Sequence, residues 1–187
     1  AFLAVALLGV IPGIGVAVAV SLLDFIRRAW RPHDAILGRA ASVKGYHDIT
    51  RYPEAKQVPG LLLYRWDAPL FFANADLFRE RILDLSERAE PKVCWVVVAA
   101  EPITDVDTTA AEMIAELDAE LAERGVELTF AEMKDPVKDR LHRYGLKAKI
   151  GRDSFFPTMG VAVKEYLDKN PVEWTDWEKR DDEAKGH

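Results

Sequence analysis

The chain has 187 residues and a formal net charge of −6. Apolar and aromatic residues make up 49% of it and charged residues 30%, so the chain can bury a core and is not disordered throughout. The acidic balance argues against nucleic acid as a partner, because binding a phosphate backbone generally needs a basic face.

An uncharged apolar segment opens the chain. Its first 23 residues carry no charged side chain, and a helix needs about 20 apolar residues to cross a bilayer core. A signal peptide would begin with basic residues, and a helix buried in a soluble protein is rarely apolar all round for so long. We therefore expect residues 1–23 to be the end of a transmembrane domain, with Pro12-Gly13 either kinking one helix or separating two. Because no initiator Met is present, we expect the chain to be part of a longer protein.

A basic stretch follows the apolar segment. It contains Arg27, Arg28, Arg31 and Arg39. Cytosolic flanks of membrane spans carry an excess of Lys and Arg, so the C-terminal side should be cytosolic. We interpret residues 24–43 as a basic juxtamembrane linker.

Strand and helix patterns then alternate, and the alternation predicts an α/β domain over residues 44–168. Strands are expected near 46–50 and at 60–66, 93–99 and 126–130, and helices at about 74–90, 109–124, 135–144 and 157–167. The expected fold is a mixed sheet flanked by helices. Residues 169–187 are expected to be a flexible acidic tail.

Three helix starts are predicted from capping residues. Asn74 is expected to cap the helix that carries Phe78 and Ile82, and Asp135 the helix that begins at Pro136. Thr109 and Glu112 have the spacing of a capping box.

Motifs for catalysis are lacking. The sequence has no phosphate loop, no GxGxxG after a strand and no HExxH, and its four histidines lack the spacing of metal ligands. The single cysteine, Cys94, lies in an apolar run and is expected to be a packing residue. Glu101, Asp105 and Asp107 follow a buried strand, where loop solvation and capping are commoner roles than acid–base or metal chemistry. We therefore expect neither an enzyme nor a bound metal or cofactor.

The segment from Glu101 to Ala110 is the candidate functional site, because it joins the apolar strand to a helix start. Free N–H groups there attract anions, so Asp107, Thr108 and Thr109 are candidates for binding an anion or a nucleotide. The same three residues are candidates for a regulatory phosphoacceptor, Thr109 above all. The alternative, favoured by the spacing to Glu112, is that Thr109 caps the helix.

Five segments also carry a family resemblance, which spans residues 27–168. They are RPHDAILGR at 31–39, YPEA at 52–55, PG at 59–60, DAPLFFANA at 67–75 and AEPITDVDTT at 100–109. Together they resemble the STAS domain, which SulP-type anion transporters share with bacterial anti-sigma-factor antagonists. The SulP branch is the more similar, and the apolar start is then similar to the end of the transporter's membrane domain.

The resemblance implies the C-terminal part of a secondary transporter for sulfate, bicarbonate, chloride or a dicarboxylate. It implies a multi-pass protein of the cell membrane with its STAS domain in the cytosol, where that domain serves folding, assembly, regulation or binding. The implied partners are the rest of the membrane domain, a second copy in a homodimer, membrane lipid, and a nucleotide or regulatory protein.

The alternative implied by the antagonist branch is a membrane-tethered signalling protein switched by phosphorylation. In that branch the loop reads Asp-Ser-Ser-Gly and its second Ser accepts phosphate. That Ser corresponds to Thr109 here, and the Gly to Ala110.

Overall fold

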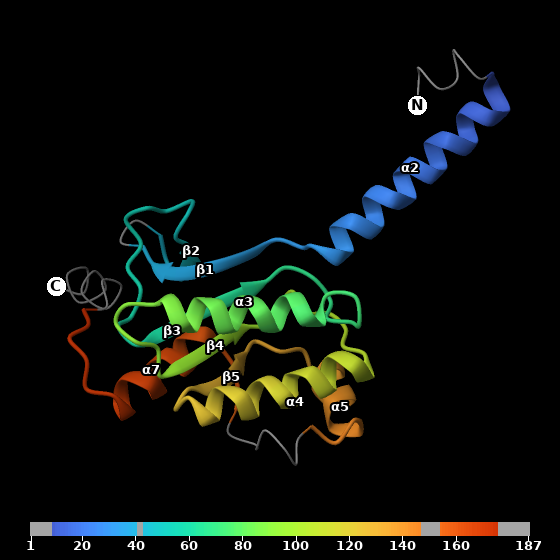
Figure 1. Cartoon of the computed structure of the whole chain (residues 1–187). Helices are drawn as coiled ribbons and strands as arrows, with labels where there is room; N and C mark the ends of the chain where they lie inside the picture. The colour runs from blue at the N-terminus through green and yellow to red at the C-terminus, as the bar shows by residue number, and fades with distance from the viewer. Residues whose placement is uncertain (1–8, 41–42, 147–153, 176–187) are drawn as a thin grey trace. The chain divides into compact units, whose positions relative to one another are not determined.

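The computed structural model describes residues 9–40, 43–146 and 154–175. The chain forms two units, Ala1–Pro32 and His33–His187. The first contains one long helix and the second an α/β domain (Figure 1).

The first unit contains helix α2, Val10–Trp30. Pro12 lies in its first turn, where a missing N–H interrupts no helical hydrogen bond, and the N–H of Gly13 donates to the carbonyl of Gly9 at 3.0 Å. From Val10 onward there is therefore one helix, while residues 1–8 of the expected span lie outside the described residues. The stretch Val10–Arg27 has a mean hydropathy of 1.8 and is almost wholly exposed, so by length and composition it is able to cross a membrane.

The second unit is built on a six-stranded mixed sheet with strand order β2-β1-β3-β4-β5-β6. Strand β1 runs antiparallel to both of its neighbours, and the strands from β3 to β6 run parallel. The mixed α/β sheet predicted from the sequence is confirmed. The strands are β1 (Asp34–Arg39), β2 (Tyr46–Asp48), β3 (Leu61–Trp66), β4 (Trp95–Ala99), β5 (Glu127–Ala131) and β6 (Phe155–Phe156).

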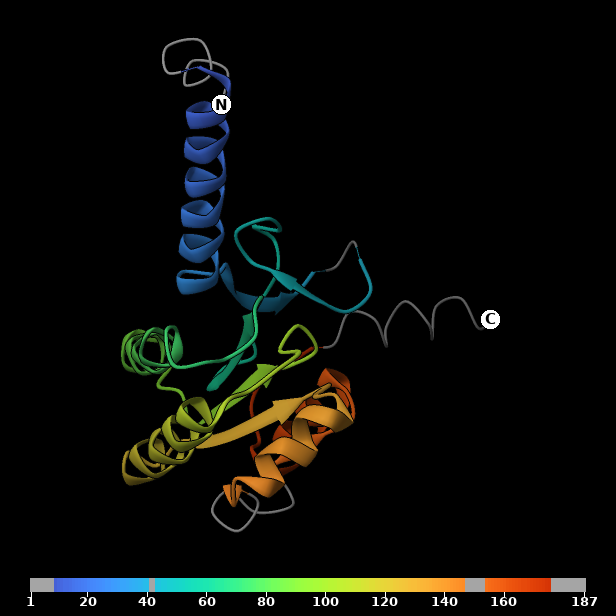
Figure 2. The same ribbon diagram turned by 90° about the vertical axis from the view of Figure 1, so that its right-hand side faces the viewer.

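Helices pack on both faces of this sheet, as Figure 2 shows for α3 and α4 on one side and α7 on the other. Strand β4 is buried on both faces, as its uninterrupted apolar sequence predicts. The helices of this unit are α3 (Ala75–Arg88), α4 (Thr108–Glu123), α5 (Asp135–Arg143) and α7 (Met159–Lys169).

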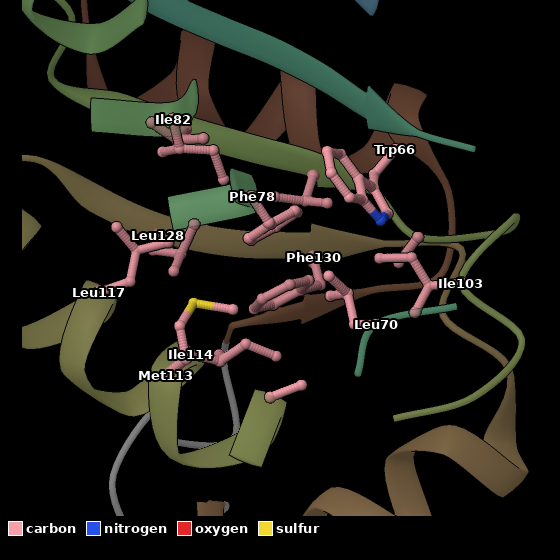
Figure 3. Close-up of a cluster of buried hydrophobic side chains, with 14 of the residues drawn as sticks. Trp66, Leu70, Phe78, Ile82, Ile103, Met113, Ile114, Leu117, Leu128 and Phe130 are labelled. Atoms are coloured by element: carbon pink, nitrogen blue, oxygen red, sulfur yellow. The ribbon is translucent and has the colours of Figure 1, made fainter. Parts of the chain in front are cut away.

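The larger core lies between the sheet and the helices α3, α4 and α5 (Figure 3). Phe78 packs edge-on against Trp66, with ring centroids 5.4 Å apart. The helical spacing predicted for α4 is confirmed, since Met113, Ile114 and Leu117 are all buried. Each large side chain buried here stabilises the fold by roughly 1.5–3 kcal/mol.

Two of the expected boundaries are wrong. The segment 24–43 is not a linker, because α2 continues to Trp30 and residues 34–39 form β1 inside the sheet. The predicted tail is not free along its whole length, because Val172 and Trp174 pack against the core under α7. Residues 176–187 of that tail lie outside the described residues.

Candidate functional site

The candidate segment after β4 is joined to the loop after β3. Leu70 and Val106 form a parallel bridge. The N–H of Leu70 donates to the carbonyl of Asp105 at 3.0 Å, and the N–H of Asp107 donates to the carbonyl of Leu70 at 3.2 Å. Because β3 and β4 are parallel neighbours, their carboxyl ends bring both loops to one edge of the sheet.

Asp107 provides the cap of α4, and the expectation that Thr109 does so is wrong. One carboxylate oxygen of Asp107 accepts from the N–H of Ala110 at 2.8 Å, and the helix begins at Thr108. The second oxygen accepts from the N–H of Phe72 at 2.9 Å. A single side chain thus caps the helix and fixes the neighbouring loop.

Thr108 and Thr109 occupy the first turn of α4 and are exposed. The structure therefore brings the three candidate residues together at one helix start, with different roles. Asp107 already accepts a first-turn N–H, while the Thr109 hydroxyl makes no hydrogen bond to any part of the chain that the structure describes. Thr109 is thus chemically accessible.

The acidic cluster does not form one site. Asp105 pairs with Arg140 of α5 and also accepts from the N–H of Val106 at 2.7 Å. Glu101 approaches the ammonium of Lys134 to 3.9 Å. Among residues 9–40, 43–146 and 154–175, no three His, Cys, Asp or Glu side chains are placed to hold a metal ion. The partners Arg140 and Lys134 come from distant sequence positions, so a single sequence gives no signal for these pairs.

Asn74 also differs from its expected role. It precedes α3 but makes no side-chain cap. Its carbonyl oxygen accepts from the N–H of Phe71 at 3.0 Å, and its amide donates to the carbonyl of Pro69 at 3.0 Å. The fully buried Asn74 therefore shapes the loop before the helix, which leaves Phe72 with 68% of its surface exposed.

Cys94 packs against neighbouring groups in the structure, as its place in an apolar run led us to expect. Its sulfur lies 3.6 Å from the hydroxyl of Tyr166 and 3.6 Å from the carbonyl of Gly60. The Tyr166 hydroxyl donates to the carbonyl of Pro59 at 2.7 Å. Burial and the nearby thiol raise the pKa of Tyr166, so its proton stays on the phenol as that donor.

Comparison with known proteins matches residues 52–162 to the model of the STAS domain. The chain belongs to the STAS domain family. The chain is 43% identical over 159 residues to a probable sulfate transporter of Mycobacterium tuberculosis, a match that covers 85% of this chain and 28% of that protein. It is 34% identical over 162 residues to high affinity sulfate transporter 2 of Stylosanthes hamata, covering 82% of this chain and 24% of that protein.

A solved structure has the same fold. The chain matches murine Slc26a9, an anion transporter in the inward-facing state, with a TM-score of 0.74 and 21% identity. That match covers 84% of this chain and 26% of the transporter. The chain thus spans about a quarter of the length of these relatives, and its domain is homologous to the STAS domains of SulP sulfate transporters.

Proposed function

We propose that this chain is the C-terminal part of a SulP-type secondary anion transporter, with α2 as the last part of the membrane domain. The observation that carries the proposal is the 43% identity to a probable sulfate transporter, which extends over 85% of the chain and so beyond the STAS domain itself. In this proposal the domain assembles with, and regulates, the membrane domain, and it performs no catalysis.

The direct test uses the full-length protein that contains this sequence. Purified and reconstituted into proteoliposomes, it should take up radiolabelled sulfate, or exchange it for bicarbonate, chloride or a dicarboxylate, with saturation. Liposomes without protein give the background. If no member of this set is transported above that background, the proposal is wrong.

Topology is part of the same proposal. The exposed apolar surface of α2 and the arginines near its end support a membrane span with the STAS domain in the cytosol. A tag after His187 should resist external protease in sealed right-side-out cells and become accessible after permeabilisation. Cleavage before permeabilisation would place the domain outside.

Phosphorylation of Thr109 is a second, regulatory proposal. It is supported by the exposed hydroxyl of Thr109 at the start of α4, where the helix dipole favours added negative charge. Mass spectrometry of the protein from its native cells, with and without phosphatase, tests it. Absence of phosphate on the Thr109 peptide under all growth conditions would refute the proposal.

A further inference from the structure

A small polar cleft of about 330 Å³ lies at the β2 edge of the sheet, where Figure 1 shows β2 beside β1. Small-molecule sites usually have roughly 300–1,000 Å³, so this volume suits a small ligand. Every side chain that lines the cleft is polar. These side chains come from His33 before β1, from β2 and the turn after it, and from Arg65 and Asp67 at the end of β3.

The strand register brings Asp48 and Arg65 to one face of the sheet. Asp48 of β2 is paired with Leu37 of β1, and Arg65 of β3 is paired with Ala35 of β1. Leu37 and Ala35 are two residues apart, so they and their cross-strand partners point to the same face. Because Ala35 has only a methyl group, it leaves room for the cleft beside Asp48.

Three of the lining side chains already satisfy one another. The carboxylate of Asp67 accepts from Nε of Arg65 at 2.8 Å and from Nδ1 of His33 at 3.0 Å. The charges of Asp67 and Arg65 therefore neutralise each other, and neither is available to a ligand. Together these side chains form one wall of the cleft.

Asp48 is left with an unused hydrogen-bond acceptor. It is only 4% exposed, and its Oδ1 accepts from both the N–H and the hydroxyl of Thr50, at 2.8 Å and 2.7 Å. Hydrogen bonding from Thr50 lowers the pKa of Asp48, so its carboxyl is charged at neutral pH. Its Oδ2 is covered and has no hydrogen-bond partner in the part of the chain that the structure describes. A buried anionic oxygen without a donor is unfavourable, so a donor that reaches it is bound favourably.

Arg51 supplies the complementary charge. Its N–H donates to the carbonyl of Asp48 at 3.1 Å, so both side chains leave one tight turn. The Arg51 side chain is exposed, and its guanidinium has no ion-pair partner among the residues that the structure describes. The rings of His47 and Tyr52 line the cleft beside them, with centroids 4.9 Å apart.

We propose that this cleft binds a free amino acid, with the ammonium group of the ligand on Asp48 and its carboxylate on Arg51. An anion alone would meet the carboxylate of Asp48, and an amine alone would lie beside an unpaired guanidinium. A zwitterion matches both charges, and the planar guanidinium binds a carboxylate through two hydrogen bonds. Because Oδ2 is covered before the ligand arrives, binding includes a shift of the turn at residues 50–52.

Binding is measured by NMR on the purified 187-residue chain, isotope-labelled in its backbone amides and held in mild detergent. Each of the common L-amino acids is added separately at millimolar concentration and constant pH. The amide signal of Thr50 reports on the site, because this N–H donates to the carboxylate of Asp48. At least one amino acid should shift the signals of residues 50–52 with saturation. If none does so, or if shifts occur only outside residues 33–67, the proposal is wrong.

Two derivatives of the bound amino acid separate its charged groups. The amino acid amide keeps the ammonium group and lacks the carboxylate, whereas the N-acetyl amino acid keeps the carboxylate and lacks the ammonium group. Each should bind at least tenfold more weakly, the usual effect of losing one hydrogen bond between charged groups. Equal binding of either derivative would overturn the assignment of a zwitterion.

Two substitutions test the location. Arg51→Gln should weaken binding of the amino acid about tenfold and leave binding of its amide unchanged, because the amide lacks the group that Arg51 contacts. Asp48→Asn should weaken binding of both, while its amide oxygen still accepts from Thr50 and preserves the turn. Arg143 is exposed and lies outside the cleft, so Arg143→Gln is the charge-matched control and should bind normally.

Unchanged affinity in Arg51→Gln would refute the site, whether or not Asp48→Asn folds. None of these measurements depends on transport, so failure of the site is distinguishable from failure of the proposed function.

Discussion

Replacing Asp107 tests the role that the structure assigns to it in joining two loops. Asp107→Ala removes the cap on Ala110 and the bond to Phe72. Losing the cap costs about 1 kcal/mol. The bond to Phe72 joins a neutral N–H to a charged carboxylate that is partly buried, so its loss adds roughly 1–2 kcal/mol. The free energy of unfolding should therefore fall by roughly 2–3 kcal/mol.

Urea unfolding in mild detergent, followed by the fluorescence of the buried Trp66 and Trp95, measures this loss. With a slope of roughly 2 kcal/mol per molar urea, the midpoint should fall by about 1 M. Asp107→Asn should lose about half as much, because an amide oxygen still caps the helix but the amide nitrogen cannot accept from Phe72. Thr109→Ala is the control and should change stability by less than about 0.5 kcal/mol. A loss in Thr109→Ala as large as in Asp107→Ala would refute the assignment of the cap.

Three further substitutions probe the domain by the same urea unfolding. Asn74→Ala should lower the free energy of unfolding by roughly 2–3 kcal/mol, because it leaves the N–H of Phe71 and the carbonyl of Pro69 without their hydrogen-bond partner. This is more than the loss of a helix cap costs. A decrease below about 1 kcal/mol would contradict the role of Asn74 in the loop. Gly60→Ala should cost at least about 2 kcal/mol, since Gly60 has a φ of 77° and an added Cβ would lie 2.5 Å from the hydroxyl of Tyr166; a neutral effect would contradict this geometry. Burial and the nearby Glu127 raise the pKa of Asp118 in the folded domain. The folded domain is therefore stabilised by the protonated carboxyl at pH values below the unfolded pKa of about 3.9, and this stabilisation is lost as the pH rises through the folded pKa. Asp118→Asn should therefore stabilise the domain at pH 7, with a gain that shrinks toward pH 3.5, and a gain independent of pH would exclude this cause.

The central strands and the helices could be predicted because the pattern of apolar residues within each segment indicates its structure. Strand β4 is apolar throughout, and α4 repeats its apolar residues at helical spacing. Strand β1 was missed because its first and last residues are charged and its stabilising contacts are distant in sequence. Asp34 accepts from Tyr64 at 3.1 Å and from Arg81 at 2.9 Å. Gly38 is needed there because a Cβ would lie 3.0 Å from the carbonyl of Lys56.

Helix starts were harder to predict than helices. Asp107 and Thr109 are both good capping residues, and a sequence does not determine which of them begins the first turn. In the structure, backbone hydrogen bonds between Leu70 and residues 105–107 fix the point at which α4 begins. The prediction that Asn74 caps α3 failed for a similar reason. Its amide group makes its hydrogen bonds within the preceding loop, and a sequence pattern does not show the conformation of that loop.

These contacts also bear on where the domain would bind an anion. At the start of α4 the carboxylate of Asp107 already accepts the N–H of Ala110, so an incoming anion would compete with that bond and meet a negative charge. A covalently attached phosphate on Thr109 would overcome the repulsion at α4, because its attachment does not depend on binding affinity. The helix start is therefore better suited to covalent modification than to reversible binding of an anion.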